Sequence, residues 1–230
     1  MPPGFPETRW TLIQKVRTEA DSTAALQEWC QNYWQPVFSY ICAQGYDRET
    51  ARELAQTFFE KLIFKGPQNV LPQELKGAFR AYLMRSVKNF LTDQWRSRQS
   101  QRKGGGTQAV PEDELAHVGD EAPNPDRAFD QSWALTILTL AMTKLENEMA
   151  SKGRSDFFHV AKTLLDGRSV TDENRQALAR SLDMQDGAFR VALHRLRGRF
   201  RQLIEDEVRE TVSTEEEFQE ELGYLFQVWS

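Results

Sequence analysis

Cysteine and histidine are scarce in this 230-residue chain, which has two cysteines and three histidines. Cys30 and Cys42 do not form a CxxC pair and the histidines are scattered, so the sequence supports neither a zinc site nor a disulfide framework. No apolar run approaches the length that crosses a membrane, and the N-terminus lacks the apolar core of a signal peptide. We therefore expect a cytoplasmic protein without a metal site.

Signatures of catalysis are missing as well. The sequence contains no glycine loop of the kind that cradles phosphate, no paired catalytic carboxylates and no nucleophile triad. The run RKGGG at residues 102–106 lacks the strand and helix context of a nucleotide site. An enzyme is the least favoured class of protein, and no cofactor is expected.

Charge is distributed unevenly along the chain. The formal net charge is −5, which is unusual for a protein that binds nucleic acid. Residues 80–103 nevertheless contain seven basic residues against one acidic residue, and residues 175–201 contain seven against two. Residues 205–221 contain nine acidic residues against one arginine. We interpret this acidic segment as a solvated helix; the alternative is that it repels DNA or folds over a basic surface.

The segment ALARSLDMQDGAFRVALHRLRGRFR, residues 177–201, has the pattern of a helix-turn-helix. Apolar residues recur at helical spacing on both sides of Asp183, Met184 and Gln185. Asp183 stands where such turns often have glycine, and aspartate is among the few other residues that tolerate the left-handed conformation. The pattern therefore predicts two helices joined by a tight turn.

The second helix of this segment separates an apolar face from a basic face. At about 100° per residue, Phe189, Leu193 and Phe200 face inward, while the outward arc is basic. A helix that enters the major groove needs this division, because arginine bonds guanine edges or phosphates there. The alternative is a solvated basic face on an ordinary hairpin. The candidate residues for duplex DNA are Gln185, Gly187, Arg190, His194, Arg197 and Arg201.

Helical periodicity extends over most of the remaining chain. It predicts a short helix around Trp10, Ile13 and Val16, a helix over residues 23–43, one over 47–63 capped by Asp47, and one over 79–101. Two further helices are expected near residues 129–149 and 157–165. Residues 103–126, rich in glycine, proline and acidic residues, predict a flexible linker. The fold class is all-α, with two small helical domains joined by this linker.

Trp95 lies within the first basic segment, residues 80–103. Helical projection places Lys88, Thr92 and Trp95 on one outward face, with Arg85 and Arg96 beside them. Single-stranded DNA is bound by this combination, since bases stack on rings while cations follow the phosphates. Trp95 packed against a neighbouring helix is an equally weighted alternative.

Three stretches resemble an extracytoplasmic-function (ECF) sigma factor of bacterial RNA polymerase. DRETARELAQTFFEKLI (residues 47–63) is similar to the helix that docks on the clamp coiled coil of the polymerase. FRAYLMRSVKNFLTDQWRSR (79–98) is similar to the promoter-melting segment, and residues 177–199 to the reader of the minus-thirty-five element. FPETRWTLI, RKGGG and FDQSWAL further resemble the subgroup common in planctomycete-like bacteria.

The resemblance implies a division of labour along the chain. Residues 1–102 would form a region 2-like domain that binds core polymerase and melts the promoter, 103–126 a linker, 127–210 a region 4-like helix-turn-helix domain, and 211–230 an acidic C-terminal extension. The implied partners are promoter DNA and core RNA polymerase, through its β′ clamp coiled coil and β flap; an anti-sigma factor is left open. The implied polymerase-binding residues are Glu53, Gln56, Phe59 and Glu60. The implied residues for single-stranded minus-ten DNA are Lys76, Arg80, Arg85, Lys88, Asn89, Thr92, Trp95 and Arg96.

The chain departs from the family pattern in places. The usual short entry to region 4 is replaced by the two helices expected at 129–165, and Asp183 replaces the glycine of the turn. Beyond the minimal architecture, Thr214 and Glu217 form a possible capping box before an apolar stripe that includes Phe218 and Leu225. Two other classes of protein remain open: a stand-alone helix-turn-helix transcriptional regulator, which would normally dimerise, and an adaptor that binds proteins.

Overall fold

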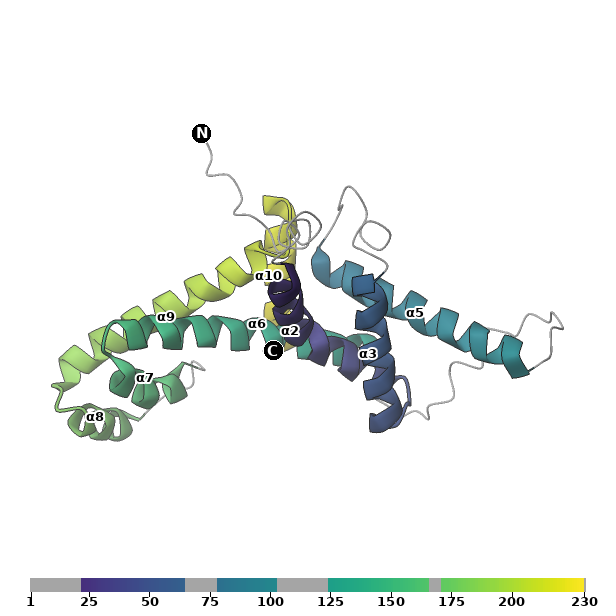
Figure 1. The fold of residues 1–230 in the computed structure, drawn as a ribbon. Coiled ribbons are helices and arrows are strands. Elements are labelled where there is room, and N and C mark those ends of the chain that lie inside the picture. Colours follow the sequence, from purple (N-terminus) through teal and green to yellow (C-terminus); the bar gives the residue numbers. More distant parts are fainter. Residues whose placement is uncertain (1–21, 65–77, 103–123, 166–170, 230) are drawn as a thin grey trace. The chain divides into compact units, whose positions relative to one another are not determined.

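The computed structural model describes residues 22–64, 78–102, 124–165 and 171–229, and this part of the chain contains helices and no strand. The all-α class is therefore confirmed for the described residues, whereas the helix expected around Trp10 lies outside them. Figure 1 labels the α-helices: α2 (Ser22–Ala43), α3 (Arg48–Phe64), α5 (Phe79–Arg102), α6 (Pro125–Ser151), α7 (Ser155–Ala161), α8 (Asp172–Ser181), α9 (Asp186–Arg209) and α10 (Glu215–Trp229). A 3-10 helix, η2 (Lys162–Leu164), follows α7.

Contacts divide the chain into two compact units. Of the described residues, those up to Thr136 and from Arg209 onward form unit 1, and Ile137–Val208 form unit 2. The division falls within α6 and at the end of α9, away from residues 103–126 where a linker is predicted. Most of that predicted linker lies outside the described residues, and α6 already begins at Pro125.

Aromatic rings fill the core of unit 1. Tyr33 of α2 stacks on Trp133 of α6 with ring centroids 5.0 Å apart, and it meets Phe79 of α5 edge-on at 5.0 Å. Phe129 stacks on Trp133 at 6.2 Å. All four rings are almost completely buried, and burial of side chains of this size is a large stabilising contribution. The first part of α6 therefore shares its core with α2 and α5.

The caps of α3 and α10 follow from local sequence. Oδ1 of Asp47 accepts hydrogen bonds from the backbone N–H groups of Glu49 and Thr50, each at 3.0 Å, as the predicted N-cap requires. The hydroxyl of Thr50 donates to Oδ2 at 2.6 Å. At α10, the Glu217 N–H donates to the Thr214 hydroxyl at 3.2 Å, and the Glu217 carboxylate accepts from the Ser213 N–H at 2.8 Å. The predicted pairing of Thr214 with Glu217 is therefore present, with the return bond one residue earlier than in a standard capping box.

Helix α10 is integrated into unit 1. Its Phe218 and Leu225 are each 2% exposed. The backbone N–H of Phe79 donates to the Thr211 carbonyl at 2.9 Å, which joins the start of α5 to the turn before α10. The segment from Thr211 onward is therefore packed against the helix that carries the first basic segment. Phe226, the residue after Leu225, is 52% exposed.

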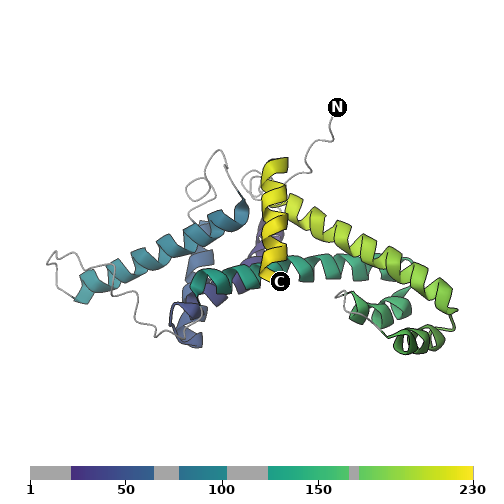
Figure 2. The same cartoon turned by 180° about the vertical axis from the view of Figure 1, so that it is seen from behind.

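Unit 2 has its own core, formed by α6, α7, η2, α8 and α9. Phe189 of α9 meets Phe157 of α7 edge-on at 5.8 Å, and Leu145 and Phe158 are buried in the same cluster. Figures 1 and 2, seen from opposite sides, both place α7 and α8 at the N-terminal end of α9. These contacts fix one face of α9 in the core and leave the opposite face outside it.

Candidate nucleic-acid interface

The turn between α8 and α9 has the conformation that the sequence suggests. Asp183 has a φ of 52°, which is the left-handed region. The Thr171 hydroxyl caps the start of α8 by accepting from the Asn174 N–H at 3.3 Å. Both α8 and the turn are thus built from local signals in the sequence.

An ion pair ties α8 to the first turn of α9. The Arg175 guanidinium donates to both carboxylate oxygens of Asp186, at 2.8 and 3.2 Å, and also contacts Asp172. The bonds from Arg175 hold the pKa of Asp186 below its ordinary range. The angle between the two helices is therefore braced by a bidentate contact as well as by the core.

The outward face of α9 is exposed along its length. Gln185, Gly187, Arg190, His194 and Arg201 are all exposed, as an interface with duplex DNA would require. Arg180 of α8 and Arg195 of α9, which were not among the candidate residues, are exposed as well. The two outward glycines, Gly187 and Gly198, have no atom within 4 Å of the position that a Cβ would occupy. This face is therefore positively charged and sterically open.

Arg197 differs from the other candidate arginines. Its Nε and one terminal nitrogen donate to the carbonyl of Leu164 at 3.0 and 2.7 Å, so the guanidinium caps the end of η2. Arg199, the residue directly after Gly198, pairs with Glu148 of α6, and its Nε donates to the Glu148 carboxylate at 3.0 Å. These two guanidinium groups are committed to the packing of unit 2, so a role for Arg197 in DNA binding would compete with its bonds to Leu164.

The predicted single-strand surface on α5 is only partly free. Arg85, Asn89 and Arg96 are exposed. Thr92 is half-buried and its hydroxyl donates to the Lys88 carbonyl at 3.0 Å. Two of the candidates have other environments: Lys88 pairs with Asp126 at 2.8 Å while 42% of its side chain stays exposed, and Trp95 is half-buried. Lys76 lies outside the described residues.

Arg80 belongs to an internal ion cluster. Its guanidinium donates to both carboxylate oxygens of Glu221, at 2.8 and 2.9 Å, and to Asp130 at 2.7 Å. It also lies 3.9 Å from the centroid of the Tyr224 ring, and only 13% of its side chain is exposed. Burial alone would lower the pKa of Arg80, but the carboxylates outweigh burial and raise it. Arg80 could bind DNA only if these bonds broke, so it is not part of the exposed surface.

The partners of Arg80 were not anticipated from the sequence. Asp130 is on α6 and is 50 residues away in the chain, and Glu221 and Tyr224 are on α10. The Tyr224 hydroxyl donates to Asp130, and burial together with this carboxylate raises the pKa of Tyr224 to about 12. For Glu221 the sequence offered one signal, the acidic segment 205–221 with its alternative of folding over a basic surface, but this did not identify Arg80 as the basic partner.

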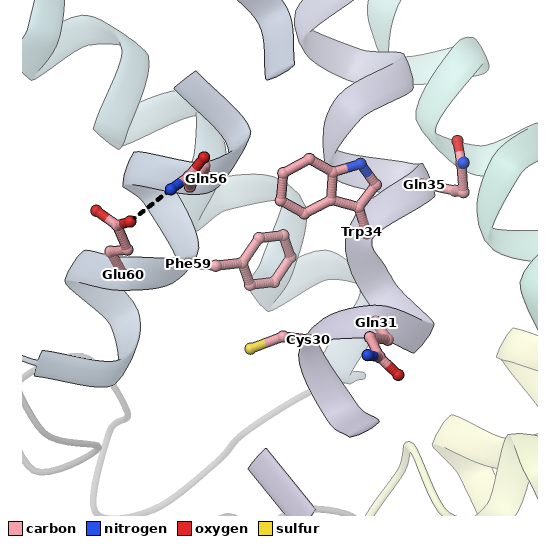
Figure 3. A pocket seen from close by; sticks show the side chains of 7 residues that line it. All are labelled: Cys30, Gln31, Trp34, Gln35, Gln56, Phe59 and Glu60. Carbon is pink, nitrogen blue, oxygen red and sulfur yellow. Dashed lines mark hydrogen bonds between the residues drawn. The ribbon is translucent and has the colours of Figure 1, made fainter. Parts of the chain in front are cut away.

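A groove lies between α2 and α3 of unit 1. Three of the four predicted polymerase-binding residues line it. Its volume is about 420 Å³, and its lining consists of Cys30, Gln31, Trp34, Gln35, Gln56, Phe59 and Glu60. Figure 3 shows the rings of Trp34 and Phe59 facing each other from the two helices; their centroids are 5.7 Å apart. Beside them, the Gln56 amide donates to the Glu60 carboxylate at 2.9 Å.

The groove combines an apolar floor with a polar edge. Phe59 is only 4% exposed, so it forms part of the floor of the groove. Glu53, Gln56 and Glu60 are exposed. Burial raises the pKa of the Cys30 thiol to about 11, which keeps it protonated and unreactive at neutral pH. The lining therefore offers apolar surface from Trp34 and Phe59 beside the polar side chains of Gln56 and Glu60.

No metal site or membrane span is found within the described ranges. No cluster of three or more histidine, cysteine, aspartate or glutamate side chains there could hold a metal ion. None of the helices in these ranges is long and apolar enough to cross a membrane. Comparison with protein-family models, with curated proteins and with solved structures found no match to this chain.

Proposed function

We propose that this chain is a sigma factor of the extracytoplasmic-function type, which directs core RNA polymerase to promoters and helps to melt them. The observation that carries the proposal is the outward face of α9, where Arg190, His194 and Arg201 are exposed on a helix braced against α8. The resemblance of three stretches in the family's order supports the same conclusion. The protein itself performs no covalent step, because the polymerase adds the nucleotides.

In this proposal α9 binds the upstream promoter element as duplex. The helix of a helix-turn-helix that enters the major groove must keep a fixed angle to its partner helix. The contact between Arg175 and Asp186 braces α9 against α8 in this way. Arg190 and His194 lie one helical turn apart on the open face and would reach base edges or phosphates. Gly187, beside them, leaves room for close approach of the backbone.

Helix α5 would hold the melted downstream strand. Arg85, Asn89 and Arg96 would offer exposed contacts to phosphates and bases. Trp95, which is half-buried, directly precedes Arg96 in the sequence and would offer a ring for stacking. Extruding a base costs a few kcal/mol, and stacking on an aromatic ring returns roughly 1–3 kcal/mol per base. Arg80 is left out of this surface because Glu221 and Asp130 bind it.

The groove between α2 and α3 would receive the polymerase. A coiled coil presents a continuous helical surface, and an apolar floor with a polar edge is the usual anatomy of a site for such a surface. Trp34 and Phe59 would supply the floor, while Gln56 and Glu60 would supply polar contacts. Promoter selectivity would then depend on both units of one chain.

The test is run-off transcription with core RNA polymerase from the source organism and a library of promoter sequences. We expect selective transcripts that require the full chain. The double variant Arg190→Ala with His194→Ala should abolish them without weakening binding to core, and Gln56→Ala with Glu60→Ala should weaken core binding by about tenfold or more. Arg127→Ala, an exposed arginine of α6 outside these surfaces, is the charge-matched control.

The alternatives have distinct outcomes. Selective duplex binding by the chain alone, without core binding or transcripts, would indicate a stand-alone regulator and contradict a sigma factor. Core binding that is unaffected by the groove variants would contradict the assignment of the groove. Transcripts that persist in the α9 double variant would contradict the assignment of α9.

A further inference from the structure

An aliphatic side chain stands on the basic outward face of α9. Val191 is 52% exposed. Among the described residues three large hydrophobic side chains are exposed to this degree, and Val191 is the one that belongs to unit 2. Its neighbours on the same face, Arg190, His194 and Arg195, are also exposed.

The packing of unit 2 does not explain a valine here. The core side of α9 is formed by Phe189, Leu193, Leu196 and Phe200, all buried, and Val191 lies outside this cluster. A β-branched residue on an exposed helix face is less favourable than alanine, because its side chain loses rotamer freedom against the preceding turn. The position therefore leaves about half of an apolar side chain exposed on the side of α9 away from the core.

The surface around Val191 is also open to a partner. Gly187 precedes it by one turn of helix, and Gly198 follows on the same arc. Neither glycine has a neighbouring atom within 4 Å of the place where a Cβ would stand. The isopropyl group is thus flanked by bare backbone along the helix and by cationic side chains around it, so a negatively charged partner can approach it closely.

We propose that Val191 recognises the 5-methyl group of a thymine in the major groove. This methyl is the one apolar group that a base pair presents on that edge, and aliphatic side chains contact it. Arg190 and Arg195 would bind phosphates or guanine edges around it, so the valine would add sequence selectivity to a surface that is otherwise dominated by charge. The inference rests on the proposed binding of duplex DNA by α9 and assigns it a base preference.

The test removes the thymine 5-methyl group and the Val191 side chain separately. A promoter duplex selected in the transcription experiment is prepared with each thymine of the upstream element replaced in turn by deoxyuridine, which lacks only the 5-methyl group. Affinity is measured with the full chain assembled with core polymerase, for the wild type and for Val191→Ala. Arg195→Ala is the control, because loss of a charge on the same face should weaken both duplexes alike.

We expect deoxyuridine at one position to weaken wild-type binding about fourfold, the effect of one apolar methyl group. Val191→Ala should bind the thymine duplex about fourfold more weakly and should not respond to deoxyuridine at that position. A wild type insensitive to every replacement, or a Val191→Ala protein with the wild-type response, would overturn the role of Val191 while leaving duplex binding intact. Absence of any selective duplex binding would contradict the proposed function itself.

Discussion

A single residue, Asp183, determines the backbone path between α8 and α9. Its φ of 52° costs a residue with a Cβ about 1–2 kcal/mol unless its side chain compensates locally. We expect Asp183→Gly to be more stable than Asp183→Ala, with a free energy of unfolding about 1 kcal/mol higher, since glycine adopts this conformation without steric cost. Urea denaturation followed by circular dichroism measures the difference. Equal stability of the two variants would mean that the turn relaxes to another conformation.

At the same scale, sequence reasoning succeeded where the cause was local. The cap at Asp47 and the left-handed Asp183 depend on residues a few positions away, so both were predictable. Arg197 became a candidate for DNA through helical projection and Arg80 through the family resemblance, but their partners Leu164 and Glu221 are 33 and 141 residues away. Helical projection identifies the direction of a side chain and cannot identify which distant element meets it.

Among the helices, α6 and α9 are joined by an ion pair that titrates in acid. Arg199 holds the pKa of Glu148 below its ordinary value of 4.5. The folded chain therefore binds this proton more weakly than the unfolded chain, so the contribution to stability is present above pH 4.5 and is lost as the pH falls through the folded pKa. We expect Glu148→Gln to have a lower melting temperature at pH 7 and a shallower decline below pH 4.5.

Melting followed by circular dichroism between pH 7 and pH 3 checks this expectation. Arg199→Gln should reproduce the shallower decline, because it removes the same interaction from the other side. Asp186 and Asp47 also have lowered pKa values, so both variants retain part of the acid dependence. A decline as steep as in the wild type would show that the contact between Glu148 and Arg199 contributes little to stability.

Helix α10 is expected to stabilise unit 1. Phe218 is 2% exposed and lies under the Arg209 guanidinium, 3.8 Å from the ring centroid. Phe218→Ala should lower the free energy of unfolding by about 3–5 kcal/mol, which is typical for removing a buried ring. Phe226→Ala, on the same helix but 52% exposed, is the matched control and should lower it less. Urea denaturation of both variants decides whether α10 is a structural part of the unit.

Element boundaries were more predictable than the association of elements. The helix over 79–101 is observed as Phe79–Arg102, because its apolar stripe is a local feature of the sequence. The family resemblance assigned residues 211–230 to an extension beyond the minimal architecture, and it did not identify unit 1 as the place where Phe218 and Leu225 of α10 are buried. An apolar stripe indicates that a helix face is covered but does not identify what covers it.

For the whole molecule, a net charge of −5 conceals two positively charged surfaces. In the proposed function each surface contacts phosphates, and the connection within one chain raises the effective concentration of the second contact once the first has formed. Each phosphate contact releases condensed counterions, so the logarithm of the binding constant falls linearly with the logarithm of salt concentration. Under the proposed function, this chain is therefore expected to bind promoter DNA with a steep dependence on salt, although its net charge is negative.

The salt dependence also distinguishes surface arginines from structural ones. Removing one phosphate contact should reduce the magnitude of the slope by about 0.9 on duplex DNA and about 0.7 on a single strand. Arg201→Ala on α9 and Arg96→Ala on α5 should each have such an effect, whereas Arg127→Ala on α6 should leave the slope unchanged. Fluorescence anisotropy of a labelled promoter bound by the chain with core polymerase, measured at several KCl concentrations, determines each slope. Equal slopes for all three variants would contradict the assignment of α5 and α9 to DNA, because the loss of any exposed charge would then be equivalent.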